Sequence, residues 1–336
     1  MVRFFHNLAD DKTKARFRGT LSSMAAAPLK ALPNTRERTY STPDFQWFLC
    51  NRVQAQQPAA ADIALQYCSC IHGVMVRDPI GDGRHFRRCR RHNVMIRVHD
   101  TIRDLLHMMA RSAGLTSIKE PLGLLLDNYL ERPADWLIKG WNIPGVQETD
   151  HAMDLTLPLT DSGWVNLTEA VRKERAHTVG ATGVSSEQKK RDCVGSAEDQ
   201  RARGNSDTMF ERCKYRNIHF WPVALEGDGV PTENFISYLN HVCDAAVKFK
   251  GANRGSFKSY FLSRIGNTLH QVSAKLALRQ TAAARARLVH RQATDDGLRD
   301  NVDFAQELQK VVPAFVSKRS EWRNRNTNMG VRLRSM

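Results

Sequence analysis

Two aspartates, Asp135 and Asp154, combine a residue type and a spacing that suit metal chemistry. Asp135 lies two residues after Pro133 and directly precedes a predicted strand, and Asp154 lies within the next predicted strand. Carboxylates on adjacent strands can share one or two Mg²⁺ ions, which would polarise a phosphodiester and lower the pKa of a bound water. A simpler interpretation makes Asp135 a turn residue after proline and Asp154 a charge near the end of a strand.

This pair of carboxylates resembles the metal site of PD-(D/E)XK nucleases. In that architecture a lysine lies two positions after the second acidic residue, on the same face of the strand. Thr156 occupies this position here, so a cation from a later segment would have to replace the lysine. The candidates are Lys189, Lys190 and Lys214.

A second group of residues has the chemistry of a zinc site. Three of the seven cysteines lie between positions 68 and 89, in the spacing Cys68-x-Cys70-x14-His85-x3-Cys89. Three thiolates and one imidazole complete a tetrahedral zinc shell with no position left open for water. The pattern therefore predicts a structural zinc site, with His72 and His92 as rival fourth ligands. The plainer alternative is a set of reduced cysteines beside a surface histidine.

Basic residues crowd the same loop, and positive charge beside a structural zinc suits contacts with phosphate. A solvated basic loop is the alternative. These residues are Arg84, Arg87, Arg88, Arg90 and Arg91.

The charge of the whole chain also favours a polyanionic partner. Its 336 residues include 50 Lys and Arg against 35 Asp and Glu, which gives a formal net charge of +15. Nucleic acid is the commonest partner of such chains, and an anionic membrane surface is second. The longest aliphatic run, residues 124–126, is far shorter than the ~20 apolar residues of a transmembrane helix. With no apolar secretory signal at the N-terminus, we expect an intracellular, nuclear protein that is neither secreted nor in a membrane.

Several elements must position these residues. Apolar residues at helical spacing predict a helix over residues 98–113, closed by Gly114. Short strands are expected at 115–118, 136–138 and 152–158, and a strand covered on both faces at 218–225. In the third strand one face is buried and the other presents Asp154 and Thr156. Further helices are expected near 45–53, 167–177, 235–246 and 257–291, whereas the Gly-, Ser- and charge-rich residues 180–207 predict an exposed loop.

A series of short motifs follows one another along the chain: Cys68-Ser69-Cys70, Gly81-Asp82, His85, Cys89, Arg97-Val98-His99-Asp100, Arg103-Asp104, Ala113-Gly114, Glu120-Pro121, Arg132-Pro133-Ala134-Asp135, Ala152-Met153-Asp154-Leu155-Thr156 and the run from Phe220 to Glu226. Their order resembles the C-terminal end of reverse-transcriptase polyproteins from site-specific non-LTR retrotransposons, over roughly residues 30–290. That end is a CCHC zinc knuckle followed by a restriction-like endonuclease.

The resemblance implies an Mg²⁺-dependent endonuclease that nicks target DNA to prime reverse transcription. Asp135 and Asp154 match the metal-binding carboxylates of the family, and Lys189 or Lys190 lies in the helical segment that holds its displaced lysine. Glu120 would support the metal site, although an exposed acid at the end of a strand is the alternative.

The same resemblance assigns DNA contacts to the basic loop and to the start of the first helix. Arg97 and His99 match the family's Arg-x-His stretch, where His99 contacts DNA or orients the site. Asp100 would act with them or, equally, cap the helix N-terminus.

The chain also departs from the family. The family usually has Gly-Asp-His, whereas Gly83 and Arg84 separate Asp82 from His85 here. Residues 193–209 look like an insertion. No Tyr/Phe-x-Asp-Asp polymerase motif occurs in the sequence, so the chain is not a reverse transcriptase by itself. The resemblance therefore implies a fragment or a decayed copy, with DNA or RNA and an upstream-encoded reverse transcriptase as partners.

Together these observations predict an α/β fold in which a restriction-endonuclease-like mixed sheet is flanked by helices. We divide the chain into a basic, loosely structured N-terminal segment (1–60), a zinc-knuckle-like loop (61–95), the nuclease-like core (96–250, with an insertion at about 180–209), and C-terminal helices with a basic tail (251–336).

Three functions remain open at this point. The chain is a zinc-containing, Mg²⁺-dependent endonuclease, or it uses the same fold to hold nucleic acid without cleaving it, or it is a structural basic protein. The first requires a lysine within hydrogen-bonding distance of Asp135 and Asp154, and the third predicts that the acidic residues do not converge.

Overall fold

The computed structural model describes residues 10–18, 20, 22, 24–30, 39–53, 93–125, 133–159, 167–194, 200 and 206–295. The chain divides into one unit of residues 1–284 and a second of residues 285–336. The sheet belongs to the first unit. Of the second unit, the described residues are the last turns of helix α14 (Arg254–Asp295).

A four-stranded mixed sheet forms the centre of the first unit. Its strands are β1 (Thr116–Lys119), β2 (Trp136–Lys139), β3 (Asp150–Thr156) and β4 (Ile218–Ala224), and they lie in the order β1-β2-β3-β4. The first three are antiparallel neighbours, and β4 runs parallel to β3. A parallel pair needs a long crossover connection, and α9 (Glu169–His177), α10 (Ala181–Arg191) and α12 (Met209–Lys214) lie in that connection.

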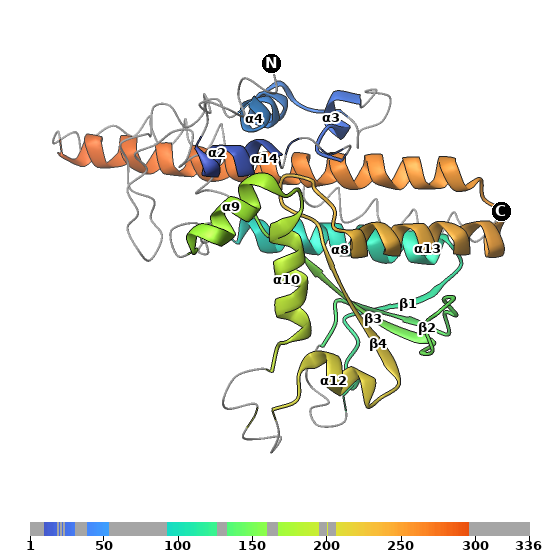
Figure 1. The fold of residues 1–336 in the computed structure, drawn as a ribbon. Coiled ribbons are helices and arrows are strands. Elements are labelled where there is room, and N and C mark those ends of the chain that lie inside the picture. The colour runs from blue at the N-terminus through green and yellow to red at the C-terminus, as the bar shows by residue number, and fades with distance from the viewer. Residues whose placement is uncertain are drawn as a thin grey trace. The chain divides into compact units, whose positions relative to one another are not determined.

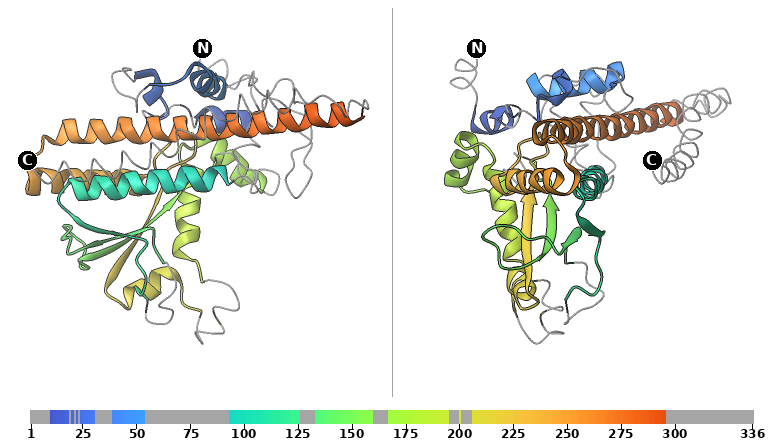
Figure 2. Two further views of the ribbon diagram at one scale, coloured as in Figure 1. Left: turned by 180° about the vertical axis from the view of Figure 1, so that it is seen from behind. Right: turned by 90° about the vertical axis from the view of Figure 1, so that its right-hand side faces the viewer.

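Helices cover both faces of this sheet (Figures 1 and 2). On one face Trp136, Met153 and Trp221 belong to the main core, together with residues of α8 (Val94–Ser112) and α13 (Glu233–Lys250). On the other face Leu137, Ala152 and Phe220 pack with residues of α12 in a smaller core. The prediction of an α/β fold with a mixed sheet flanked by helices is therefore confirmed.

Helix α8 confirms the apolar periodicity read from the sequence. Its buried residues include Val98, Ile102, Leu106 and Met109, which face the core. The helix ends at Ser112, and Gly114 follows with a φ of 86°. That left-handed conformation is the one glycine supplies after a helix C-terminus. The predicted helix cap at Asp100 is wrong, because α8 begins at Val94 and Asp100 lies in its second turn.

Two further expectations differ from the structure. Residues 181–191, expected within an exposed loop, form helix α10, which packs on β3 and β4. As a consequence both faces of β3 are covered, and Asp154 is 9% exposed rather than open to solvent.

The N-terminal segment contains more order than its polar composition predicts. It forms α2 (Asp11–Arg18), α3 (Ala27–Lys30) and α4 (Thr42–Val53), the last of which was expected near 45–53. Met24 joins the main core, and Trp47 packs against Ala274 and Ala277 of α14. Among the helices of the described segments, none is both long enough and apolar enough to cross a membrane.

Candidate active site

Asp135 and Asp154 face each other across the β2–β3 pair. The antiparallel register places Trp136 opposite Met153. Asp135 directly precedes Trp136 and Asp154 directly follows Met153, and the amide of Asp135 donates to the carbonyl oxygen of Met153 at 2.9 Å. Both carboxylates line one cavity. The amide of Leu155 donates to Oδ2 of Asp135 at 2.7 Å, which fixes the orientation of this carboxylate. The expectation that Asp135 directly precedes one strand and that Asp154 lies within the next is confirmed, and the two strands are neighbours.

Helix α10 brings a lysine to this pair. Nζ of Lys190 lies 2.9 Å from Oδ2 of Asp154. Of the three candidate lysines, Lys190 lines the cavity at the carboxylates, whereas Lys189 and Lys214 are exposed and do not contribute to its lining. The cation beside Asp154 thus comes from a residue 34 positions later in the chain than Thr156.

The contact between Lys190 and Asp154 depends on how α10 is anchored to β4. One turn before Lys190, the buried carboxylate of Glu187 accepts hydrogen bonds from the amide of Ala224, at 2.7 Å, and from the hydroxyl of Thr232. Its other oxygen accepts from Nδ2 of Asn234 at 2.9 Å. These polar contacts, together with a close approach at Gly183, hold α10 against the sheet and set the position of its last turn.

His99 approaches Asp135 from the first helix. Its Nε2 lies 3.2 Å from Oδ2 of Asp135 and 3.0 Å from the carbonyl oxygen of Leu155, and its Nδ1 lies 3.3 Å from Asp100. Every one of these neighbours is an acceptor, so both ring nitrogens can donate only when the imidazole is protonated. The site therefore favours a positively charged His99 beside the carboxylate.

Glu120 joins the same region from the end of β1. Its amide donates to the carbonyl oxygen of Asp135 at 2.8 Å, and its carboxylate forms an ion pair with Arg103. Its φ of 45° is a left-handed conformation that non-glycine residues rarely adopt. Glu120 lines the cavity with Asp135 and Asp154, so it is more than an exposed acid at a strand end.

The pKa values of the two aspartates are shifted in opposite directions. Burial, with a contribution from the nearby Asp135, raises the pKa of Asp154 to about 6, although Lys190 acts to lower it. Burial also favours the neutral form of Asp135, but its contacts with His99 and the amide of Leu155 hold its pKa below the usual value. Two like charges in one buried site commonly separate in this way.

Neighbouring carboxylates also raise the pKa values of the two cations, Lys190 and His99. Burial acts to lower the pKa of Lys190, but Asp154 and Asp135 together raise it above the usual value. The pKa of His99 is likewise raised, because its hydrogen bonds to Asp135 and Asp100 outweigh its burial. Perturbed titratable groups that converge on a cavity are characteristic of functional sites.

A cavity of about 270 Å³ opens over these residues. Cys193 and Met209 also line it, and sequence reasoning did not single out either residue. The position of Cys193, three residues after Lys190, was the only available signal, and it becomes meaningful only once α10 is known to be helical.

The donor set of the cavity is compatible with Mg²⁺. Within the described segments, no group of three or more His, Cys, Asp and Glu residues is close enough to hold a metal ion. Mg²⁺ is usually held by one or two carboxylates and keeps several waters, and Asp135 and Asp154 supply two carboxylates. The residues of this cavity would therefore hold Mg²⁺ through carboxylate oxygens, with water completing the coordination.

Arg97 is described and exposed in the first turn of α8, close in sequence to His99. The other predicted contacts and ligands lie outside the described residues: Cys68, Cys70, His85 and Cys89, the rivals His72 and His92, and the arginines Arg87, Arg88 and Arg91.

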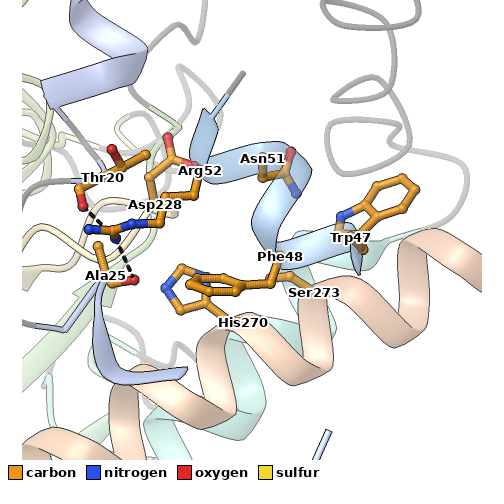
Figure 3. A pocket seen from close by; sticks show the side chains of 9 residues that line it. All are labelled: Thr20, Ala25, Trp47, Phe48, Asn51, Arg52, Asp228, His270 and Ser273. Carbon is orange, nitrogen blue, oxygen red and sulfur yellow. Dashed lines mark hydrogen bonds between the residues drawn. The ribbon is translucent and has the colours of Figure 1, made fainter. Parts of the chain in front are cut away.

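A second cavity lies between the N-terminal segment and α14 (Figure 3). Arg52 there donates to the carbonyl oxygens of Thr20, at 2.7 Å, and of Ala25, at 3.1 Å, while Phe48 stacks edge-on against His270. Its volume of about 20 Å³ is close to that of one water molecule. We therefore take the cavity at Asp135 and Asp154 as the candidate active site.

Comparisons with known protein families, with curated proteins and with solved structures find no match to this chain.

Proposed function

We propose that this chain is an Mg²⁺-dependent DNA endonuclease with a restriction-like core, which nicks DNA at the Asp135–Asp154 site. The observation that carries the proposal is the convergence of two carboxylates and one lysine from three separate elements. Lys190 lies 2.9 Å from Asp154, and this proximity supports the nuclease over a pure binding module.

The proposal assigns a role to each residue of the site. Asp135 and Asp154 hold the divalent cation, and Glu120 supports them from the neighbouring strand end. A bound Mg²⁺ would polarise the phosphodiester and favour ionisation of the attacking water. Lys190, whose ammonium lies beside Asp154, would donate to a phosphate oxygen and stabilise the charge that develops there. His99 orients Asp135 by donating to its Oδ2.

Nicking of supercoiled plasmid by the purified full chain with Mg²⁺ tests this proposal. We expect nicking to vanish in Asp154→Ala and to fall by about 10²-fold in Lys190→Met, because a charge-stabilising donor is worth this much. Lys189→Met is the matched control, since Lys189 is the adjacent residue on the same helix and is exposed.

Three other outcomes of the nicking experiment would each contradict a different part of the proposal. Equal losses in Lys189→Met and Lys190→Met would contradict the assigned role of Lys190. No nicking by a folded, metal-loaded protein would replace the endonuclease by a module that holds nucleic acid without cleaving it. Nicking that survives in Asp154→Ala would mean that the carboxylate assignment is wrong.

We also propose that the chain carries a structural zinc and is related to the end of a non-LTR retrotransposon polyprotein. Cys68, Cys70, His85 and Cys89 supply a complete ligand set in the sequence. Elemental analysis should find one zinc per chain, and Cys89→Ser should remove it, whereas Cys193→Ser should not. A zinc-free wild-type protein that still nicks DNA would separate the two proposals and overturn this one.

A further inference from the structure

The chain contains a long stretch without negative charge. Between Asp244 and Asp295, fifty consecutive residues include ten Lys and Arg and no Asp or Glu. No other stretch of the sequence without Asp or Glu is as long, although the chain has 35 acidic residues in all. A run of one sign on this scale creates a field that attracts polyanions.

The first part of this stretch folds into a helical hairpin. Helix α13 ends at Lys250, Gly251 makes the turn with a φ of 62°, and α14 begins at Arg254. Contacts of Arg254 with Asp244 (2.5 Å) and of Lys258 with Asn240 (2.7 Å) show that the two helices run antiparallel. Figures 1 and 2 show the same hairpin, with its turn at one end of α14.

Exposed aromatic rings lie among the cations of this hairpin. Phe249 is 52% and Tyr260 is 42% exposed. The ammonium of Lys248 lies 5.3 Å from the ring centre of Phe249, and the guanidinium of Arg264 lies 5.8 Å from that of Tyr260. We call these residues the hairpin surface: Lys248, Phe249, Lys250, Arg254, Tyr260 and Arg264.

Local helix stability accounts for only part of this arrangement. Lys248 and Lys250 complement the negative end of the α13 dipole. Arg254 and Lys258 lie at the start of α14, where the dipole disfavours cations, and the first turn of that helix contains no acidic residue. Instead, Arg254 and Lys258 contact Asp244 and Asn240 of α13, so these two cations help to join the helices of the hairpin.

The hairpin surface is separate from the candidate active site. Phe249 and Lys250 lie against Gly114 at the end of α8, whereas His99 lies in its first half. His99 precedes Ser112 by 13 residues, or about 20 Å along the helix at 1.5 Å per residue. A strand that occupied both places would have to extend over several nucleotides.

We propose that the hairpin surface binds single-stranded DNA, with its cations on the phosphates and Phe249 and Tyr260 stacked on bases. A positive surface with interspersed aromatic rings is the chemistry that holds unpaired strands without sequence preference. The choice of DNA rather than RNA rests on the proposed function, because nicking frees a DNA strand. The binding itself does not require the carboxylate site.

The test is the binding of oligothymidylate to the full chain without added Mg²⁺, so that a failure of cleavage leaves this result unaffected. Phe249→Leu, which keeps an apolar contact over Gly114, should weaken binding about tenfold, since one stacked base is worth this much. Tyr215→Leu is the matched control, because Tyr215, directly after α12, is 72% exposed.

The charge contribution is tested by the salt dependence of binding. The double variant Lys248→Gln/Lys250→Gln should reduce the slope of log affinity against log salt by about 1.4, at about 0.7 per lost phosphate contact. The variant Lys139→Gln/Lys173→Gln removes the same net charge from exposed positions elsewhere and should leave the slope unchanged.

Three results would overturn the proposal. The first is an equal effect of the hairpin and control variants on DNA binding. The second is tighter binding of oligouridylate RNA than of oligothymidylate by the wild-type protein. The third is a loss of binding to phosphatidylserine vesicles in the hairpin variants while their binding to DNA stays intact. The last result would assign the surface to a membrane. Intact binding combined with absent nicking would support the hairpin surface and contradict the proposed endonuclease.

Discussion

The carboxyl group of Asp154 is held where its ionisation is costly. Burial is the main cause, and the neighbouring charge of Asp135 adds to it, while Lys190 offsets part of the cost. The folded protein therefore retains a proton on Asp154 at pH values where the unfolded chain has lost it. By linkage, the contribution of this group to stability is greatest below the ordinary pKa and declines as pH rises toward 6.

This linkage predicts that Asp154→Asn stabilises the fold while it abolishes nicking. A pKa raised from 3.8 to about 6 corresponds to about 3 kcal/mol, and we expect a gain of about 1–3 kcal/mol in the free energy of unfolding at pH 7.5. Lys190 would lose its partner at little cost, because it can turn its ammonium to solvent.

Urea denaturation at pH 7.5 and pH 4 measures this effect. The gain should shrink toward pH 4, which lies well below the folded-state pKa of about 6 and close to the ordinary value of 3.8. Asp192→Asn is the control, since Asp192 is exposed at the end of α10. A destabilised Asp154→Asn at pH 7.5 would show that the negative charge is well compensated in the wild-type protein.

The same titration predicts the acid limb of the nicking rate. Since Asp154 must be ionised to hold Mg²⁺, the rate at low Mg²⁺ should fall about tenfold per pH unit below pH 6. Raising Mg²⁺ should move this limb to lower pH, because the cation competes with the proton. A limb that does not move with Mg²⁺ would point to a different titrating group.

At the scale of elements, α10 shows why composition misled the prediction. Its sequence has no apolar stripe, since it contains Gly183, two serines and five charged or amide residues. Helix formation here depends on tertiary contacts that no periodicity announces. Glu187 and Glu226 supply them: Glu187 bonds the amide of Ala224, and Glu226 accepts from the amide of Gly183 at 3.1 Å.

Gly183 has a specific role in this packing. A Cβ at this position would lie 2.6 Å from Cγ2 of Thr232, and Thr232 is buried at the start of α13. Gly183→Ala should therefore push α10 away from β4, at a net cost of about 1–3 kcal/mol despite the better helix propensity of alanine.

Because Lys190 lies two turns further along the same helix, Gly183→Ala should also lower the nicking rate. Thermal unfolding and plasmid nicking measure the two effects. Val184→Ala on the exposed side of α10 is the control and should change neither. Unchanged nicking in Gly183→Ala would show that Lys190 reaches its place independently of the packing at Gly183.

At the scale of the whole molecule, the core belongs to residues 1–284. Residues 285–336 carry 11 Lys and Arg against 6 Asp and Glu. A chain that ends at Ala284 should therefore keep its melting temperature within about 2 °C, since the buried clusters lie before that residue.

The same truncation should weaken nucleic-acid binding at low salt, because it removes a net charge of five. Differential scanning calorimetry and the salt dependence of oligothymidylate binding measure the two effects. A large drop in melting temperature would mean that the second unit contributes to the core of the first.

Local periodicity in the sequence was sufficient for α8 and for the apolar strand β4, and it placed Asp154 on a strand and Asp135 directly before another. Apolar residues at i, i+3 and i+4 must share one face of a helix, and alternating residues must share one face of a strand, whatever the remainder of the chain does. The sequence likewise revealed the acid-free stretch from 245 to 294, because charge can be counted without coordinates.

The choice among Lys189, Lys190 and Lys214, the burial of Asp154 and the contact of His99 with Asp135 came from the tertiary structure alone. Each depends on how far one element lies from another, and that distance is set by long-range contacts such as those of Glu187, Gly183 and Thr232. Such contacts join residues 36–56 positions apart in the chain, for example Lys190 with Asp154 and His99 with Leu155, so no local pattern records them.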